Sequence, residues 1–290
     1  MNKGCFLLHI DIGGSYVKIG ILDSFLGACS YKVVLTMETP QRLDDVCDLV
    51  INYIELKLPS EVRSLRKTHC LIGVPGVPAS SSLGHEEWMI PHLGKHLNLS
   101  PLRKFLLGKV IALTVVNDAL ALLKIATLEP FAAGNHLLLS FGTSLGCAFK
   151  RGCSERSLEL AHSPLLLHGS VSVDQYANRY GVIPKSSQRI KCLDLYNGNV
   201  LCDLIRKSLE SRSELDIQDY FYSLFHMIDV VLASEAVQGN YLVHLYGSVF
   251  SGFSRLEMEC LLSGLALQSL IENQYSLASI NFNRLAAGGY

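Results

Sequence analysis

Two stretches of the chain, residues 6–22 and 136–149, combine glycine with hydroxyl side chains between apolar runs. In both stretches the pattern predicts a strand, a turn and a second strand. Glycine permits positive φ and close backbone approach, while hydroxyls and exposed amides can donate to phosphate oxygens. One such turn alone is typical of an ordinary hairpin. Two favour a protein that binds phosphate from both sides, through Gly13, Gly14 and Ser15 in the first turn and Gly142 and Thr143 in the second.

Asp11 ends the first apolar run, next to the first turn. After the turn, the apolar residues Val17, Ile19 and Ile21 alternate with others, which predicts another strand. Rossmann and Walker phosphate sites need a helix after their glycine loop. The pattern therefore argues against both of these nucleotide sites.

A second carboxylate lies where a predicted strand meets a predicted helix. Residues 110–116 indicate a buried strand and residues 119–128 a long apolar helix, with Asn117 and Asp118 at the junction. Ligands of open α/β sheets bind at this edge, and a carboxylate there can accept a hydroxyl proton during phosphoryl transfer. Asn and Asp are also common helix N-caps, so capping is the alternative role of this dipeptide.

Another candidate pair, Glu159 and His162, follows the second turn. Side chains three residues apart can reach one site from a tight turn or from the first turn of a helix. A solvated surface pair is the alternative interpretation of these two residues.

The rest of the chain predicts further helices and strands around these candidates. The strand predicted at 241–246 runs into Gly247 and Ser248 and then a helix, an arrangement that the adenosine end of a nucleotide needs. The polar stretch 185–219 indicates helices with surface loops, and no function is assigned to it. Additional predictions are helices at 43–56, 220–236 and 255–270, a strand that begins at Cys70, and a polar loop at 80–87.

Composition limits the classes of partner. With 290 residues and 49% hydrophobic content, the chain can bury a large core, and its length favours about two domains. Its net charge is −1 and it has no basic run, which argues against nucleic acid and anionic membranes as partners. A small-molecule partner is predicted.

The cysteine, histidine and hydropathy patterns indicate whether the protein binds metal and where in the cell it is found. The nine cysteines form no Cys-x-x-Cys pair and the ten histidines no His-Glu-x-x-His motif, which predicts reduced thiols and no metal held by protein ligands alone. Apolar runs are too short to span a membrane, and Asp11 interrupts the first one too early for a signal peptide. The predicted location is cytoplasmic.

Taken together, the motifs resemble those of the ROK sugar kinases, a family of the actin, Hsp70 and hexokinase superfamily. The likeness covers nearly the whole chain, and Glu159-Leu-Ala-His162 is most similar to the polyphosphate/ATP glucokinase branch. Four segments resemble motifs of the family: residues 11–18 a first phosphate motif, 73–77 a Pro-Gly loop, 116–119 a catalytic aspartate motif and 139–146 a second phosphate motif.

This resemblance implies a two-lobed α/β fold of the actin-like ATPase type, related to ribonuclease H, with a cleft between lobes at 1–117 and 118–290. It also implies an ATP-dependent sugar kinase that uses Mg²⁺. Asp118 would be the general base and Asp11 would orient a metal-bound water. The implied sugar ligands are Asn117, Glu159 and His162, and the implied nucleotide ligands are the two glycine turns with Gly247 and Ser248.

Several residues depart from the family pattern. His92 stands where an Asn usually contacts the sugar, and Asp174 is the only stand-in for the usual third sugar-binding carboxylate. Ser144 and Ser248 replace glycines of the nucleotide turns. The family's Cys-rich zinc motif is missing, so no zinc is predicted. Lys18 is predicted to be a solvated strand residue, because this superfamily does not rely on a loop lysine.

These departures leave alternatives open. The family includes repressors that bind sugar without phosphorylating it, so a catalytically weak sugar sensor is one alternative. A kinase of an N-acetylhexosamine, or of another acceptor such as pantothenate, is another. Polyphosphate could replace ATP as the donor. No helix-turn-helix precedes Cys5, which argues against DNA binding, and the resemblance implies a homodimer.

Overall fold

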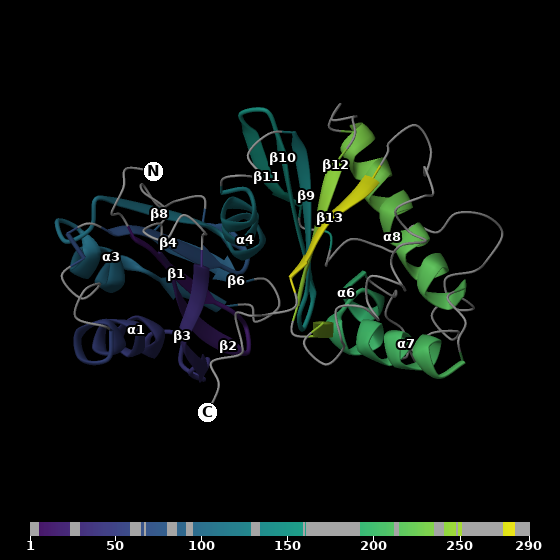
Figure 1. Ribbon diagram of the computed structural model, residues 1–290. Helices are drawn as coiled ribbons and strands as arrows, with labels where there is room; N and C mark the ends of the chain where they lie inside the picture. Colours follow the sequence, from purple (N-terminus) through teal and green to yellow (C-terminus); the bar gives the residue numbers. More distant parts are fainter. Residues whose placement is uncertain are drawn as a thin grey trace. The chain divides into compact units, whose positions relative to one another are not determined.

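The computed structural model contains two compact units, and the division between them falls between Leu122 and Leu123. Each unit has its own five-stranded mixed sheet (Figure 1). The predicted lobe limits, 1–117 and 118–290, stay a prediction. The structure describes residues 6–23, 30–58, 65–66, 68–79, 86–90, 95–128, 134–158, 160, 192–211, 215–234, 241–247, 249–250 and 275–281.

The sheet of the first unit has the strand order β3-β2-β1-β4-β8. Strands β1, β2 and β3 form an antiparallel meander, whereas β4 is parallel to β1 and β8 is parallel to β4. The central β1 therefore has β2 on one side and β4 on the other. The strands are β1 (Phe6–Ile12), β2 (Tyr16–Asp23), β3 (Ser30–Glu38), β4 (Thr68–Val74) and β8 (Ala112–Asn117).

Side chains of β1 alternate between the two faces of the sheet. Leu8, Ile10 and Ile12 join one buried cluster with apolar residues of α1 (Asp45–Leu56) and α3 (Ser100–Leu106). Because successive side chains of a strand point to opposite faces, the chemistry-bearing residues of β1 lie on the other face. A small sheet of β5 (Val77–Pro78), β6 (Glu87–Ile90) and β7 (Lys95–Asn98) completes the described part of this unit.

The sheet of the second unit repeats the same topology, with the order β11-β10-β9-β12-β13. Again the first three strands are antiparallel neighbours and the last two run parallel to the central strand. The same strand order therefore occurs in both units. The strands are β9 (Asn135–Phe141), β10 (Leu145–Arg151), β11 (Ser154–Leu158), β12 (Tyr241–Tyr246) and β13 (Tyr275–Asn281).

Helices cover one face of this second sheet, as Figure 1 shows for the green α7 and α8. Leu137, Leu139 and Phe141 of β9 pack against them in a single buried cluster. The intervening residues of β9 therefore face the other side of the sheet. The helices are α6 (Cys192–Leu195), α7 (Gly198–Ser211) and α8 (Leu215–Ser234), and α4 (Asp118–Ala126) contains the division between the units.

Several elements differ from the predictions. The strand predicted to be buried at 110–116 is β8, an edge strand whose Ala112 and Thr114 are exposed, because an apolar run does not distinguish a central strand from an edge. Strand β13 was not predicted, since its serines break the apolar pattern. The predicted helix at 255–270 lies outside the described residues. Within the described ranges, no helix is both long and apolar enough to cross a membrane.

Candidate functional site

The first glycine turn joins β1 to β2, and its backbone is hydrogen-bonded by Thr39, a residue that the sequence analysis did not identify. Gly13 donates its backbone N–H to the Tyr16 carbonyl at 2.8 Å, and a Cβ at position 13 would lie 2.8 Å from that oxygen. Thr39, which follows β3, donates its backbone N–H to Ser15 O at 2.9 Å and its hydroxyl to Gly13 O at 2.7 Å. Gly14 and Ser15 are exposed, so the predicted turn forms and faces solvent.

Asp11 and Lys18 are direct cross-strand partners in the β1–β2 register. Partners of this kind project from the same face of a sheet. Burial raises the pKa of Asp11 to about 6, while Lys18 acts to lower that pKa and Asp118 to raise it. Lys18 is partly buried. Lys18 is a strand residue as predicted, but it is only partly solvated because the register brings it opposite Asp11.

Asn117 and Asp118 lie at the junction of β8 and α4, and both side chains accept a hydrogen bond there. Asn117 is buried; its Oδ1 accepts the Ala119 N–H at 3.0 Å and its Nδ2 donates to Gly76 O at 3.1 Å. Asn117 thus caps α4 and ties the helix to the Pro-Gly loop. Asp118 begins α4, is partly exposed, and accepts the Ala119 N–H at 2.8 Å.

Close packing of α4 on the sheet positions Asp118 near Asp11. Gly73 of β4 is the register partner of Asp11, and a Cβ on Gly73 would lie 3.0 Å from Ala121 Cβ and 3.2 Å from Asp118 Cα. Glycine at position 73 is what allows the first turn of α4 this close to β4. Burial raises the pKa of Asp118, and the Ala119 N–H acts in the opposite direction.

His9 is a buried neighbour of this site that the sequence analysis did not identify. Its Nε2 lies 3.6 Å from the position that a Cβ on Gly73 would occupy. Burial lowers the pKa of His9 to about 3, and Lys18 adds to that effect. The imidazole is therefore neutral at physiological pH and adds no charge beside the two carboxylates.

The second glycine turn joins β9 to β10 and is also exposed, at Gly142, Thr143 and Ser144. Gly142 donates its N–H to Ser144 O at 3.2 Å. Within the described ranges, Leu65 is the one non-glycine residue at positive φ. Ser144 therefore does not adopt the positive φ that would favour glycine at this position.

Two segments far along the chain meet this second turn. Gly198 donates its N–H to Gly142 O at 2.8 Å. A Cβ on Gly247, whose φ is +151°, would lie 2.4 Å from Phe141 O. Gly247 was predicted to be part of the nucleotide site, and it does lie against the turn. Gly198 belongs to the polar stretch to which no function was assigned.

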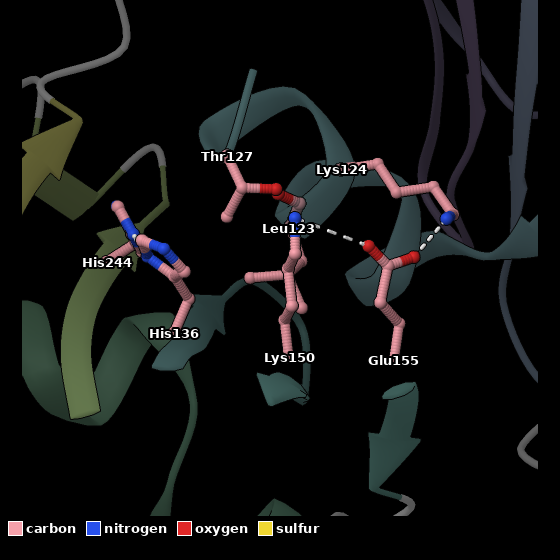
Figure 2. Close-up of polar contacts among 7 residues, drawn as sticks. All are labelled: Leu123, Lys124, Thr127, His136, Lys150, Glu155 and His244. Carbon is pink, nitrogen blue, oxygen red and sulfur yellow. Dashed lines mark hydrogen bonds and ion pairs between the residues drawn. The ribbon is translucent and has the colours of Figure 1, made fainter. Parts of the chain in front are cut away.

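The face of the second sheet opposite α7 and α8 carries two groups of polar side chains, which are among the residues drawn in Figure 2. Glu155 of β11 lies between Lys124 of α4 and Lys150 of β10, with ion pairs to both; the Lys150 Nζ to Glu155 Oε1 distance is 3.7 Å. His136 and His244 are buried side by side, with Nδ1 and Nε2 3.0 Å apart. Burial lowers the pKa of His244 to about 4, and His136 contributes to that shift.

The predicted sugar ligands other than Asn117 lie outside the described residues, as does one predicted nucleotide ligand. Their roles stay predictions. In the portion of the chain that is described, no three His, Cys, Asp or Glu side chains gather as a metal ion would require. The residues concerned are His92, Glu159, His162, Asp174 and Ser248.

Solved structures match the chain although no family model and no curated protein does. A glucokinase from an Antarctic psychrotroph is similar with a TM-score of 0.54 and 15% identity, over 96% of this chain and 95% of that one. A ROK family glucokinase from Streptomyces griseus, in complex with glucose and AMPPNP, is similar with a TM-score of 0.55 and 15% identity, over 95% of this chain and 93% of that one.

A regulator has the same fold. This ROK family transcriptional regulator, a homolog of the E. coli MLC protein, is similar with a TM-score of 0.56 and 17% identity, over 95% of this chain and 74% of that one. At such identities the likeness concerns the fold. The predicted α/β fold of the actin-like ATPases is thereby confirmed, and the chain folds like the ROK glucokinases and this ROK regulator.

Proposed function

We propose that the protein is an ATP-dependent sugar kinase of the ROK type, which transfers the γ-phosphoryl group of ATP to a hydroxyl of a hexose. The observation that carries this proposal is the position of Asp118. It begins α4 at the end of β8, close enough to Asp11 to raise the pKa of that carboxyl, and Asp11 stands beside an exposed glycine turn. Phosphoryl transfer needs a site for the donor phosphates, a metal ion and a proton acceptor close together, and this arrangement could provide all three.

Asp118 is the proposed general base. The raised pKa of its partly exposed carboxyl strengthens it as a proton acceptor, provided that it is ionised at the working pH. The turn at Gly13, Gly14 and Ser15 would hold phosphate oxygens through its amides and hydroxyl. Phosphoryl transfer depends mainly on positioning and on charge stabilisation, so a rigid turn beside a rigid helix start is suited to it.

The two carboxylates also fit a magnesium ion. Asp118 raises the pKa of Asp11, so a cation beside both groups would relieve their repulsion. Carboxylate oxygens are ligands that Mg²⁺ accepts, usually with several waters kept. Mg²⁺ bound with ATP would supply charge neutralisation of the phosphates. Asp11 is the residue proposed to hold it, through a water.

The sugar is proposed from resemblance. Glu159 and His162 would hold sugar hydroxyls, with His92 and Asp174 as weaker candidates. Asn117 would contribute as well, although both ends of its amide already bond within the protein. A glucose-like hexose is the first expectation. An N-acetylhexosamine or another acceptor on the same fold is the variation to test.

A second candidate function is that of a sugar sensor with weak or no catalysis. The likeness to a transcriptional regulator, at a TM-score of 0.56, is the observation that favours it. A sensor would bind sugar and respond in stability, but sugar would not accelerate ATP turnover.

The deciding experiment measures ADP release from Mg-ATP in the presence of glucose, mannose, fructose and N-acetylated hexoses. It compares the wild type with Asp118→Asn and with Asp48→Asn, a matched change of an exposed carboxylate in α1. We expect one sugar to stimulate release, and Asp118→Asn to lower that rate by about 10²- to 10⁴-fold, as for loss of a general base. If no sugar stimulates release but one raises the melting temperature, the sensor is correct.

A further inference from the structure

Two glycines from distant segments of the chain contact the backbone at the second glycine turn. Gly198, the first residue of α7, donates its N–H to Gly142 O at 2.8 Å. Gly247, which follows β12, stands so close to Phe141 O that a Cβ on it would lie 2.4 Å from that oxygen. Gly198 thus bonds the carbonyl of Gly142, and Gly247 packs against the carbonyl of Phe141, the last residue of β9.

This arrangement sets the direction of an amide. The carbonyl of Gly142 and the N–H of Thr143 belong to one planar trans peptide, in which the two groups point in opposite directions. Since Gly142 O points to Gly198, the Thr143 N–H points away from α7. Gly142 and Thr143 are both exposed, so this N–H is directed to the open side of the turn. A phosphate oxygen on that side would meet a donor of fixed direction.

Glycine is needed at position 198 for space. A Cβ there would lie 3.0 Å from Gly142 O and 3.2 Å from Phe141 O, closer than side-chain carbons normally approach an oxygen. The turn would have to move by a few tenths of an ångström to make room. Glycine is a poor helix former, so α7 itself does not call for glycine at this position. The glycine therefore serves the turn and not the helix.

We infer that Gly198 is a positioning residue for the nucleotide: it fixes the second glycine turn so that the Thr143 amide faces a phosphate group of a nucleoside triphosphate. The inference rests on the proposed function, and it adds a segment outside every motif of the sequence analysis. It assigns no contact between Gly198 and the nucleotide, since Gly198 acts through the turn.

The test uses Gly198→Ala, with Asn199→Ala as its matched control. Asn199 is the next residue of α7, its side chain is exposed, and its replacement also favours the helix without approaching the turn. Binding of the non-hydrolysable analogue AMPPNP with Mg²⁺ is measured by titration calorimetry, and the melting temperature is measured without ligand. We expect the Kd of Gly198→Ala to rise about tenfold from the displaced turn, with an unchanged or higher melting temperature. Asn199→Ala should bind as the wild type does.

Three other results would overturn the inference, each in a different way. Equal binding by Gly198→Ala and wild type would show that the turn tolerates the methyl group. A melting temperature several degrees lower would show that Gly198 is a general packing position, not one specific to the nucleotide site. Absence of AMPPNP binding by the wild type would remove the proposed kinase function itself, and the first two results leave that function standing.

Discussion

The two sheets share one topology but carry different chemistry at equivalent places. Asp11 and Lys18 are partners next to the first turn, and the corresponding register partners next to the second turn are Ser140 and Gly146. The first sheet thus presents a carboxylate and an ammonium group where the second presents a hydroxyl and no side chain. The fold supplies a strand-turn-strand unit in both copies, and charged side chains stand beside the first copy. Under the proposed function, the first copy is therefore the one suited to phosphoryl transfer.

The turns also differ in how they are held. The first is held by Thr39, which donates its hydroxyl to Gly13 O at 2.7 Å and its backbone N–H to Ser15 O. The second is held by the backbone of Gly198 and by the close approach of Gly247. A side-chain hydroxyl helps to hold the first turn, whereas the backbone of Gly198 bonds the second. Removing the Thr39 hydroxyl should therefore loosen the first turn, and adding a methyl group at position 198 should displace the second.

The largest expected difference between the two units concerns Asp11→Asn and Ser140→Ala. If Asp11 holds a metal through water, Asp11→Asn should lower sugar-stimulated ADP release by about 10- to 100-fold, as is usual for outer-shell ligands. Ser140→Ala should change it far less. Equal losses from both variants would contradict the division of chemistry between the two sheets.

The same Asp11→Asn variant should be more stable than the wild type at pH 7. The folded-state pKa of Asp11 is about 6, above its usual value of 3.8. A raised carboxyl pKa means that the folded state binds the proton more tightly, so stability falls as pH rises from about 4 to 6. The amide removes that penalty. The melting temperatures of variant and wild type should therefore converge at pH 4, and a gap that persists there would contradict this electrostatic cause.

Acid should weaken both units through buried histidines. His9 in the first unit has a pKa of about 3 and His244 in the second about 4, both below the usual 6.5. The unfolded chain therefore takes up protons first as pH falls below about 6.5, and stability is lost. Each histidine should cost about 1 to 2 kcal/mol between pH 7 and pH 5.

Hydrogen exchange can assign this acid sensitivity to one unit at a time. Compared with wild type at pH 5, His244→Gln should slow exchange in β9 and β12, and His9→Gln should slow it in β1 and β4. At pH 7 neither variant should gain protection. Protection gained in the wrong sheet would show that the histidines do not act locally.

The smallest effect is expected from Thr39→Val, which removes the hydroxyl bond to Gly13 O and keeps the shape of the side chain. Loss of one hydrogen bond should lower the free energy of unfolding by about 0.5 to 1.5 kcal/mol. The KM for ATP should rise while that for sugar stays constant. Thr36→Val, at an exposed position of β3, is the matched control. If the two variants behave alike, Thr39 does not support the turn.

Local motifs were predictable, and long-range supports were not. The strand at 241–246 is β12 at the same bounds, and Asp118 lies at a strand-to-helix junction as predicted. Each of these depends on hydropathy and turn residues adjacent in the sequence. Thr39 and Gly198 were missed because their importance arises from bonds to residues 26 and 56 positions away, Gly13 and Gly142 respectively.

The pairing of Lys18 with Asp11 was predictable from the sequence. Once residues 13–16 are accepted as the turn, antiparallel pairing places Lys18 opposite Asp11. For β8 the information is missing from the sequence, because edge and central strands share the same apolar composition, and only the neighbours decide exposure.

Asn117 has a consequence for how a mutational scan of this protein should be interpreted. Its amide bonds both the carbonyl of Gly76 and the Ala119 N–H in the first turn of α4. One side chain therefore connects the Pro-Gly loop to the helix that carries Asp118. A substitution there would alter apparent sugar affinity, turnover and thermal behaviour together. A reader of such data would assign Asn117 to the substrate. Only Asn117→Asp, which retains the oxygen that caps α4 and loses the donor to Gly76, would separate a loosened loop from a lost ligand.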